Sequence, residues 1–168
     1  ALERARIEVN NYYASEIDKY AIQIAMKNHP NTIQIGDVEK INFHEYIGKV
    51  DMLIGGSPCQ GFSFAGKQLN FMDPRSRLFF KFVEALETIK PKYFLLENVK
   101  MKKEYQDVIT KYMGVESIEI NSDLVSAQQR SRLYWTNIPN VKQPEDKHIY
   151  LEDILEYGFV DKDKSYCL

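Results

Sequence analysis

The sequence predicts an α/β fold whose sheet is mostly parallel, with an antiparallel strand at one edge. Strand and helix patterns alternate along most of the chain, as in right-handed strand–helix–strand units. Two nearly continuous apolar runs, residues 50–54 and 92–96, are typical of strands buried on both faces of a parallel sheet. No obvious helix separates the last strand patterns, residues 115–121 and 132–138, so these two can pair antiparallel at an edge.

The first part of the chain predicts one strand–helix–strand unit. Residues 8–15 are rich in aromatic side chains and predict a strand. Residues 17–29 carry apolar side chains at helical spacing, and Asn-His-Pro-Asn at 28–31 ends that helix. Residues 32–35 predict a second, short strand, and residues 42–48 predict a short helix.

The rest of the chain continues the alternation. A Gly-Gly-Ser-Pro loop follows the strand at 50–54, and residues 76–89 form a strongly amphipathic helix pattern that ends before Pro91. The elements expected after it are a strand at 92–96, a helix at 102–113, strands at 115–121 and 132–138, an exposed loop at 140–148 and a short helix at 151–157.

Length and composition are those of one soluble globular domain. The chain has 168 residues, of which 44% are hydrophobic and 27% charged. No apolar run approaches the roughly 20 residues that a membrane span needs, and the first residues do not resemble a secretion signal. The net charge of −2 argues only weakly against nucleic acid, because a local basic patch can contact phosphates.

The metal-binding and thiol residues are sparse. The two cysteines, Cys59 and Cys167, are far apart and have no zinc-type spacing, which favours a reducing, cytoplasmic setting. The histidines, His29, His44 and His148, are scattered, so we expect no metal site.

Four successive predicted strands deliver reactive groups to one edge of the sheet. Glu16, Asp37, Cys59 and Glu97 each follow the end of a strand. Ligands of open α/β sheets bind beyond the carboxyl ends of the strands. This succession of acid, acid, thiol and acid therefore predicts a ligand site there.

Glu16 and Asp37 suit an adenosyl cofactor. They are one strand–helix–strand unit apart, and an acid at such a strand end typically accepts hydrogen bonds from ribose hydroxyls. A second acid can accept from an adenine amino group. The alternative is that both are helix caps or solvated loop residues.

Cys59 has the surroundings of a nucleophile. It lies in a glycine-rich loop, residues 55–63, where backbone N–H groups would favour the thiolate and Pro58 would stiffen the approach. The alternative is a small buried hydrophobic residue.

Two further groups have both a chemical and a structural interpretation. Glu97, behind a strongly apolar strand, could donate to a ring nitrogen as a protonated carboxyl, or could be a structural acid paired with an arginine; both can be true. Arg130 and Arg132, two residues apart in an extended segment after Gln128, suit carboxylate, phosphate or a base carbonyl. Alone, they would indicate a solvated strand edge.

Six short motifs together resemble the cytosine-5 DNA methyltransferases. They occur in that family's order and spacing over roughly residues 9–138: Ala14-Ser15-Glu16, Gly36-Asp37-Val38, Pro58-Cys59-Gln60, Asp73-Pro74-Arg75-Ser76-Arg77-Leu78-Phe79, Glu97-Asn98-Val99 and Gln128-x-Arg130-x-Arg132. The resemblance implies a Rossmann-like fold of the S-adenosylmethionine-dependent methyltransferases, with S-adenosyl-L-methionine as cofactor and double-stranded DNA as partner.

The resemblance also implies catalytic roles. Cys59 would attack carbon 6 of a cytosine flipped out of the duplex. Glu97 would contact ring nitrogen 3 and the exocyclic amine. Arg132 would hold the base carbonyl, and Arg130 would support the site or a phosphate. Carbon 5 would then take the methyl group and lose its proton, which releases Cys59.

The remaining implied roles concern ligand binding. Glu16 would bind the cofactor ribose and Asp37 its adenine amine. The other cofactor-binding residues expected are Ile17, Val38, Pro58 and Leu78. The DNA-binding residues expected are Gln60, Ser63, Lys67 and Gln128, with the loop from Gly61 to Asn70 closing over the minor groove.

The sequence departs from the family at both ends. The family's first motif, Phe-x-Gly-x-Gly, is absent, as are its target recognition domain and last two motifs. We therefore expect residues 1–168 to be a single catalytic, cofactor-binding domain fragment that methylates poorly alone. A bacterial or phage source, a cytoplasmic location and a cognate restriction endonuclease are further expectations.

Three alternatives stay open. Relatives with this catalytic core methylate cytosine in transfer RNA, and the motifs do not separate the two substrates. A catalytically inert accessory subunit could keep the fold, although the presence of Cys59, Glu97 and Arg132 together argues against it. An unrelated thiol enzyme would need a histidine base near Cys59, and the sequence offers no obvious one.

Overall fold

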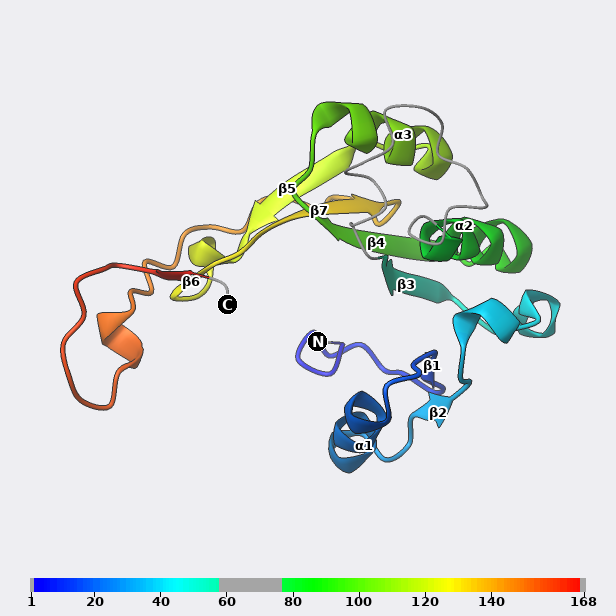
Figure 1. Ribbon diagram of the computed structural model, residues 1–168, viewed down its shortest axis with the longest axis horizontal. Coiled ribbons are helices and arrows are strands. Elements are labelled where there is room, and N and C mark those ends of the chain that lie inside the picture. Colours follow the sequence, from blue (N-terminus) through cyan, green and yellow to red (C-terminus); the bar gives the residue numbers. More distant parts are fainter. Residues whose placement is uncertain (1, 58–76, 167–168) are drawn as a thin grey trace. The chain divides into compact units, whose positions relative to one another are not determined.

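A computed structural model describes residues 2–57 and 77–166 (Figure 1). The chain divides into two compact units, residues 1–45 and 46–168. The helices and strands, in chain order, are β1 (Tyr13–Ala14), α1 (Lys19–Asn28), β2 (Ile33–Gln34), β3 (Met52–Gly56), α2 (Arg77–Ile89), β4 (Tyr93–Val99), α3 (Lys103–Met113), β5 (Ser117–Asn121), β6 (Gln128–Gln129), β7 (Ser131–Thr136) and β8 (Ser165–Tyr166). That all 168 residues form one domain stays a prediction.

The first unit is the expected strand–helix–strand unit. Strands β1 and β2 pair in parallel, and α1 connects them. Asp18 begins α1, since its carboxylate accepts hydrogen bonds from the backbone N–H groups of Tyr20 and Ala21, each at 2.8 Å. Each strand pairs over only two residues, so the strand predicted at 8–15 is much shorter than its aromatic pattern suggested.

The second unit contains a four-stranded sheet in the order β3-β4-β7-β5 (Figure 1). β3 and β4 are parallel, and β7 runs antiparallel to both β4 and β5. The antiparallel strand expected at the edge therefore lies one place inside it. The short connection from β5 allows β7 to pair as in a hairpin, and the burial of Leu133 and Trp135 on β7 suits an interior position.

One face of this sheet packs against α2 and α3. β4 alternates between partly buried and buried side chains, so Phe94, Leu96 and Asn98 share the buried face. The indole Nε1 of Trp135 donates to Thr110 Oγ1 at 2.9 Å, which ties β7 to α3. The buried residues of this core are Phe79, Phe80, Phe82, Val83, Phe94, Leu96, Ile109, Met113, Leu133 and Trp135. This dense packing makes the β4–β7 pair a rigid support for the side chains on its other face.

The last part of the chain has little regular structure. Residues 140–148 lack helix and strand, as expected, and the short helix predicted at 151–157 is one 3-10 turn, Glu152–Ile154. The chain then returns to pair β8 with β6 in parallel. Among the described residues, every helix is too short or too polar to cross a membrane.

Candidate active site

The carboxyl ends of β3 and β4 lie side by side. The strands are in register at their last shared pair, Gly56 with Glu97. Ser57 then leads into residues 58–76, which lie outside the described part of the chain. The predicted residues in that segment are Pro58, Cys59, Gln60, Ser63 and Lys67, and their roles stay predictions. The described geometry therefore fixes the point at which the chain enters the Cys59 loop.

Glu97 and Arg132 lie together on the sheet face opposite the α2–α3 core. In the antiparallel register Val99 faces Arg132, and Glu97 is two residues from Val99, so all three share one face. Arg132 Nε lies 2.9 Å from Glu97 Oε1, and the two side chains are 16% and 34% exposed. The structural alternative for Glu97, pairing with an arginine, is thus confirmed.

The contact between Glu97 and Arg132 is an ion pair rather than a well-aligned hydrogen bond. Within the described residues, the buried Nε of Arg132 has no acceptor at hydrogen-bond geometry, although Glu97 Oε1 is close. Arg132 Nη1 donates to the carbonyl of Ser131 at 2.8 Å, which holds the guanidinium along the strand. Small rotations of either side chain would free donors and acceptors for a ligand without breaking the charge pairing.

Two adjacent glycines shape the end of β3 on opposite faces. A Cβ on Gly55 would lie 2.5 Å from a ring carbon of Phe82 in the core. A Cβ on Gly56 would lie 3.2 Å from Glu97 Oε2. Gly55 therefore lets α2 approach the strand, and Gly56 leaves room for the Glu97 carboxylate.

The buried amide of Asn98 is the site residue whose role sequence reasoning missed. Asn98 is 2% exposed, and its Nδ2 reaches the carbonyl and the hydroxyl of Ser57 at 3.2 and 3.3 Å. The signal was available, because period-2 alternation places Asn98 on the buried face of β4, where an amide must find partners.

Arg130 and Gln128 lie in the connection that precedes β7. The backbone N–H of Arg130 donates to Asn121 Oδ1 at 2.9 Å, and its side chain is exposed. The carbonyl of Gln128 accepts from Ser122 Oγ at 2.6 Å. The connection is thus held by its own side chains. Of the two arginines, Arg132 is the one paired with Glu97, and the roles of Arg130 and Gln128 stay predictions.

Glu119 is a second charged group near the same strand ends. Its Oε1 accepts from Ser131 Oγ at 2.6 Å and from Lys100 Nζ at 2.9 Å. The hydrogen bond from Ser131, followed by that from Lys100, holds the pKa of the Glu119 carboxyl below its usual range. Glu119 thereby links Ser131, which precedes Arg132, to Lys100, which follows β4.

The two predicted cofactor acids lie in the first unit, at the carboxyl ends of its parallel strands. Glu16 Oε1 accepts the backbone N–H groups of Ile17 and Asp18 at 2.8 and 2.9 Å, and Asp37 Oδ1 accepts that of Glu39 at 3.0 Å. The capping alternative is therefore confirmed for Asp37, which begins a 3-10 turn, whereas Glu16 is an exposed loop residue ahead of Asp18, the N-cap of α1. Both of these bonds to Glu16 end on Oε1, so neither of them occupies Oε2, the oxygen that a ribose hydroxyl could use.

Three of the apolar residues predicted to pack around the cofactor lie on separate segments of the described chain. Ile17 is 75% exposed beside Glu16. Val38 begins a 3-10 turn after Asp37, and Leu78 lies in the first turn of α2. Their cofactor roles stay predictions.

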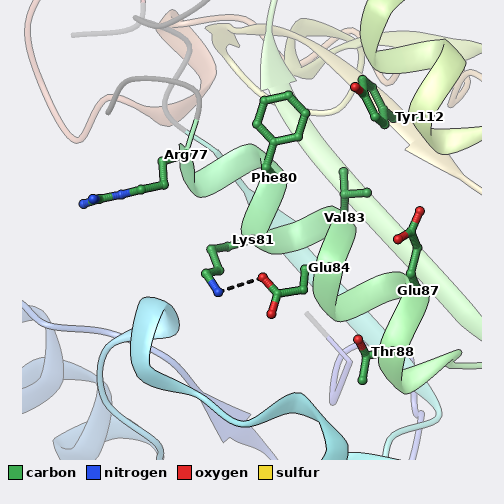
Figure 2. A pocket seen from close by; sticks show the side chains of 8 residues that line it. All are labelled: Arg77, Phe80, Lys81, Val83, Glu84, Glu87, Thr88 and Tyr112. Atoms are coloured by element: carbon green, nitrogen blue, oxygen red, sulfur yellow. Dashed lines mark hydrogen bonds and ion pairs between the residues drawn. The ribbon is translucent and has the colours of Figure 1, made fainter. Parts of the chain in front are cut away.

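A shallow hollow of about 450 Å³ lies along α2 and beside Tyr112 (Figure 2). Lys81 and Glu84 form an ion pair across its wall at 2.7 Å. None of the predicted site residues that the structure describes lines this hollow, so it is not the site to which the strand ends point.

Comparison of the sequence with known proteins gives matches to DNA methyltransferases. The family model for "C-5 cytosine-specific DNA methylase" matches residues 1–154. The Type II methyltransferase M.PspPI of Psychrobacter is 52% identical over 87 residues, which cover 51% of this chain and 21% of that protein. The Type II methyltransferase M.NlaX of Neisseria lactamica is 33% identical over 171 residues, which cover 92% of this chain and 54% of that protein. The chain thus spans between about a fifth and about half of the length of these relatives.

A solved structure supports the fold. A DNA modification methyltransferase encoded within a prophage of E. coli superposes with a TM-score of 0.63 and 28% identity, over 79% of this chain and 40% of that one. The predicted α/β fold of the methyltransferases is confirmed by this likeness together with the mixed sheet. With the family match over residues 1–154, these findings establish that the chain belongs to the C-5 cytosine-specific DNA methylase family.

Proposed function

We propose that the protein transfers a methyl group from S-adenosylmethionine to carbon 5 of cytosine in double-stranded DNA, through a covalent adduct with Cys59. The observation that carries the proposal is the pairing of Glu97 and Arg132 at 2.9 Å beside the strand end that leads into the Cys59 loop. A carboxyl and a guanidinium side by side offer the two contacts that a cytosine needs at nitrogen 3 and at its carbonyl oxygen.

The residues divide the chemistry between them. The Cys59 thiolate forms a bond to carbon 6 of the flipped base, and electron density moves onto the ring and its carbonyl. Arg132 stabilises the carbonyl oxygen, while Glu97 donates a proton or a hydrogen bond at nitrogen 3. Carbon 5 takes the methyl group as the S–CH3 bond of the sulfonium donor breaks and the donor leaves as a thioether. A base then removes the carbon-5 proton, and the electron pair left at carbon 5 expels Cys59 as thiolate. Arg130 supports the phosphate side of this site.

S-adenosylmethionine supplies the electrophilic methyl group, and the acids of the first unit suit it. Glu16 keeps Oε2 for the ribose, and Asp37 accepts from the adenine amine. Ile17, Val38 and Leu78 give apolar contacts, with Pro58 closing the approach. In the Cys59 loop, Gln60, Ser63 and Lys67 contact DNA, and Gln128 contacts it from the connection before β7.

DNA is favoured over transfer RNA as the substrate. The matching family is described as DNA methylases, and the relatives carry Type II methyltransferase names. Such enzymes pair with restriction endonucleases in modification systems, although an orphan methyltransferase of a Bacillus phage is also similar. We therefore propose a cognate endonuclease as the natural partner.

The substrate assignment is tested by methyl transfer to matched acceptors. The full-length protein that contains this sequence is incubated with labelled S-adenosylmethionine and either duplex DNA from a host without cytosine methylation or transfer RNA. The proposal predicts 5-methylcytosine in the DNA and none after Cys59→Ala. Label that enters only the RNA would transfer the assignment to the other substrate, and label in neither would favour an inert subunit.

A further inference from the structure

Asn98 connects the two strand ends that carry the proposed chemistry. It follows Glu97 directly, and its amide reaches across to Ser57, the residue two positions before Cys59. Glu97 and Asn98 point to opposite faces of β4, so one residue faces the base-binding side and the next holds the neighbouring strand. The question is whether this contact serves only the fold.

The hydrogen bonds of Asn98 leave no choice of orientation for its amide. The side-chain oxygen accepts the backbone N–H of Val99 at 2.8 Å, and that N–H can only donate. The side-chain nitrogen donates to the carbonyl of Ser57 at 3.2 Å, and that oxygen can only accept. Its second hydrogen reaches the Ser57 hydroxyl at 3.3 Å. A carboxylate of the same shape would place an oxygen against the Ser57 carbonyl.

Burial makes these bonds strong constraints on Ser57. Asn98 is 2% exposed and lies beside the core of α2, α3 and the sheet. Ser57 is itself only partly buried, but an Asn98 amide that lost the Ser57 carbonyl would have to find another acceptor inside the core. Gly56, the residue before Ser57, is already fixed in register with Glu97.

We propose that Asn98 is a positioning residue for methyl transfer, which fixes the backbone at Ser57 and so sets where the Cys59 loop leaves the sheet relative to Glu97. The inference rests on the proposed function and deepens it, because the distance between nucleophile and base-binding carboxyl decides the rate of attack. Binding of DNA and cofactor depends on other groups, so Asn98 acts on the rate of the chemical step.

The test compares two substitutions at Asn98 with a matched control. Asn98→Asp keeps the shape but reverses the polarity toward Ser57, and Asn98→Ala removes both contacts without adding a repulsive oxygen. Thr136→Val is the control, because the buried Thr136 hydroxyl bonds the Phe94 carbonyl at the far end of the same β4–β7 pair. All three variants alter a hydrogen bond made by a buried side chain, but only the first two alter the bond to Ser57.

Single-turnover methyl transfer to unmethylated plasmid DNA is measured with the full-length protein, per mole of folded enzyme, together with the dissociation constants for DNA and cofactor. We expect both Asn98 variants to slow transfer about tenfold or more, with both dissociation constants within about twofold of wild type. Thr136→Val should transfer at close to the wild-type rate. For Asn98→Asp, the rate relative to wild type should rise as the pH falls, because the introduced carboxyl regains a proton to donate to Ser57.

Three results would count against the inference. Wild-type rates in either folded Asn98 variant would overturn it, and so would equal slowing by Thr136→Val, which would reduce Asn98 to a general stabiliser. A wild-type enzyme that transfers no methyl group to DNA would instead refute the proposed function, and the inference would fall with it.

Discussion

Replacing Gly55 with alanine should destabilise the second unit through a single contact. The new Cβ would lie 2.5 and 2.7 Å from two ring carbons of Phe82, whereas carbon atoms in packed cores prefer about 3.5–4.0 Å. The Phe82 ring, 8% exposed within the core, must therefore retreat by about 1 Å. Overpacking of this kind costs roughly 1–3 kcal/mol. The stiffer unfolded chain recovers about 0.4–1 kcal/mol. We expect a net loss of about 1–2 kcal/mol in the free energy of unfolding.

The assay has a built-in probe, because the sequence contains one tryptophan and Trp135 is fully buried in the same core. Thermal unfolding followed by tryptophan fluorescence should show a midpoint lower by about 2–8 °C for Gly55→Ala. Gly56→Ala is the control, since its one tight contact is with the movable carboxylate of Glu97 at 3.2 Å, and the Glu97 carbonyl lies at an ordinary 3.7 Å. It should change stability by less than about 0.5 kcal/mol while it slows methyl transfer. Equal midpoints for the two variants, or a lower one for Gly56→Ala, would refute this reading of the glycine pair.

Three further predictions concern other side-chain contacts of the second unit. Thr110→Val leaves the buried indole N–H of Trp135 without its acceptor at 2.9 Å and should cost about 1–3 kcal/mol in urea unfolding, whereas an unchanged urea midpoint would show that the bond adds nothing. The lowered pKa of Glu119, caused first by the Ser131 hydroxyl, stabilises the fold above the ordinary glutamate pKa and is lost as pH falls through the lowered value. Wild type should therefore melt at a higher temperature than Ser131→Ala near pH 6, and this difference should shrink as the pH is lowered to about 3. A difference that does not change with pH would contradict this role of Glu119. Arg132→Lys keeps the charge but loses the planar fork, so it should reduce the rate of methyl transfer at least tenfold with little change in DNA affinity; a rate near wild type would remove Arg132 from the site.

The hydrophobic patterns of the sequence predicted the helices and strands better than they predicted the order of the strands in the sheet. The apolar periods of α2 and β4 depend on neighbouring residues, and α2 lies within one residue of its predicted bounds. β4 was predicted at 92–96 but spans Tyr93–Val99, so Glu97, which was expected to follow the strand, lies within it. The place of β7 between β4 and β5 depends on which strands meet across the sheet, which local periodicity does not contain. The two-residue pairs β6 and β8 were missed for the same reason.

The residues of the candidate site also fall into those that the sequence could identify and those that it could not. Glu97 could be singled out because a carboxyl next to a strongly apolar strand is unusual, and Arg132 because it belongs to a motif of the family. The two side chains meet at 2.9 Å, from positions inside β4 and β7. Gly55 and Gly56 carried no such signal, because their roles depend on contacts with Phe82 and Glu97 that only the folded chain creates. The alternation of β4 marked Asn98 as a buried amide, but its partner, Ser57, is known only from the fold.

The most direct test of the central claim is a covalent trap. The full-length protein is incubated with S-adenosylmethionine and duplex DNA that carries 5-fluorocytosine, whose carbon 5 has no proton to lose, so the adduct cannot be released. The account predicts a protein–DNA complex that survives denaturation, that Cys59→Ala abolishes, and that Glu97→Gln and Asn98→Asp form much more slowly. A complex of undiminished yield from Cys59→Ala, or no complex from a wild-type protein that binds the DNA, would contradict it.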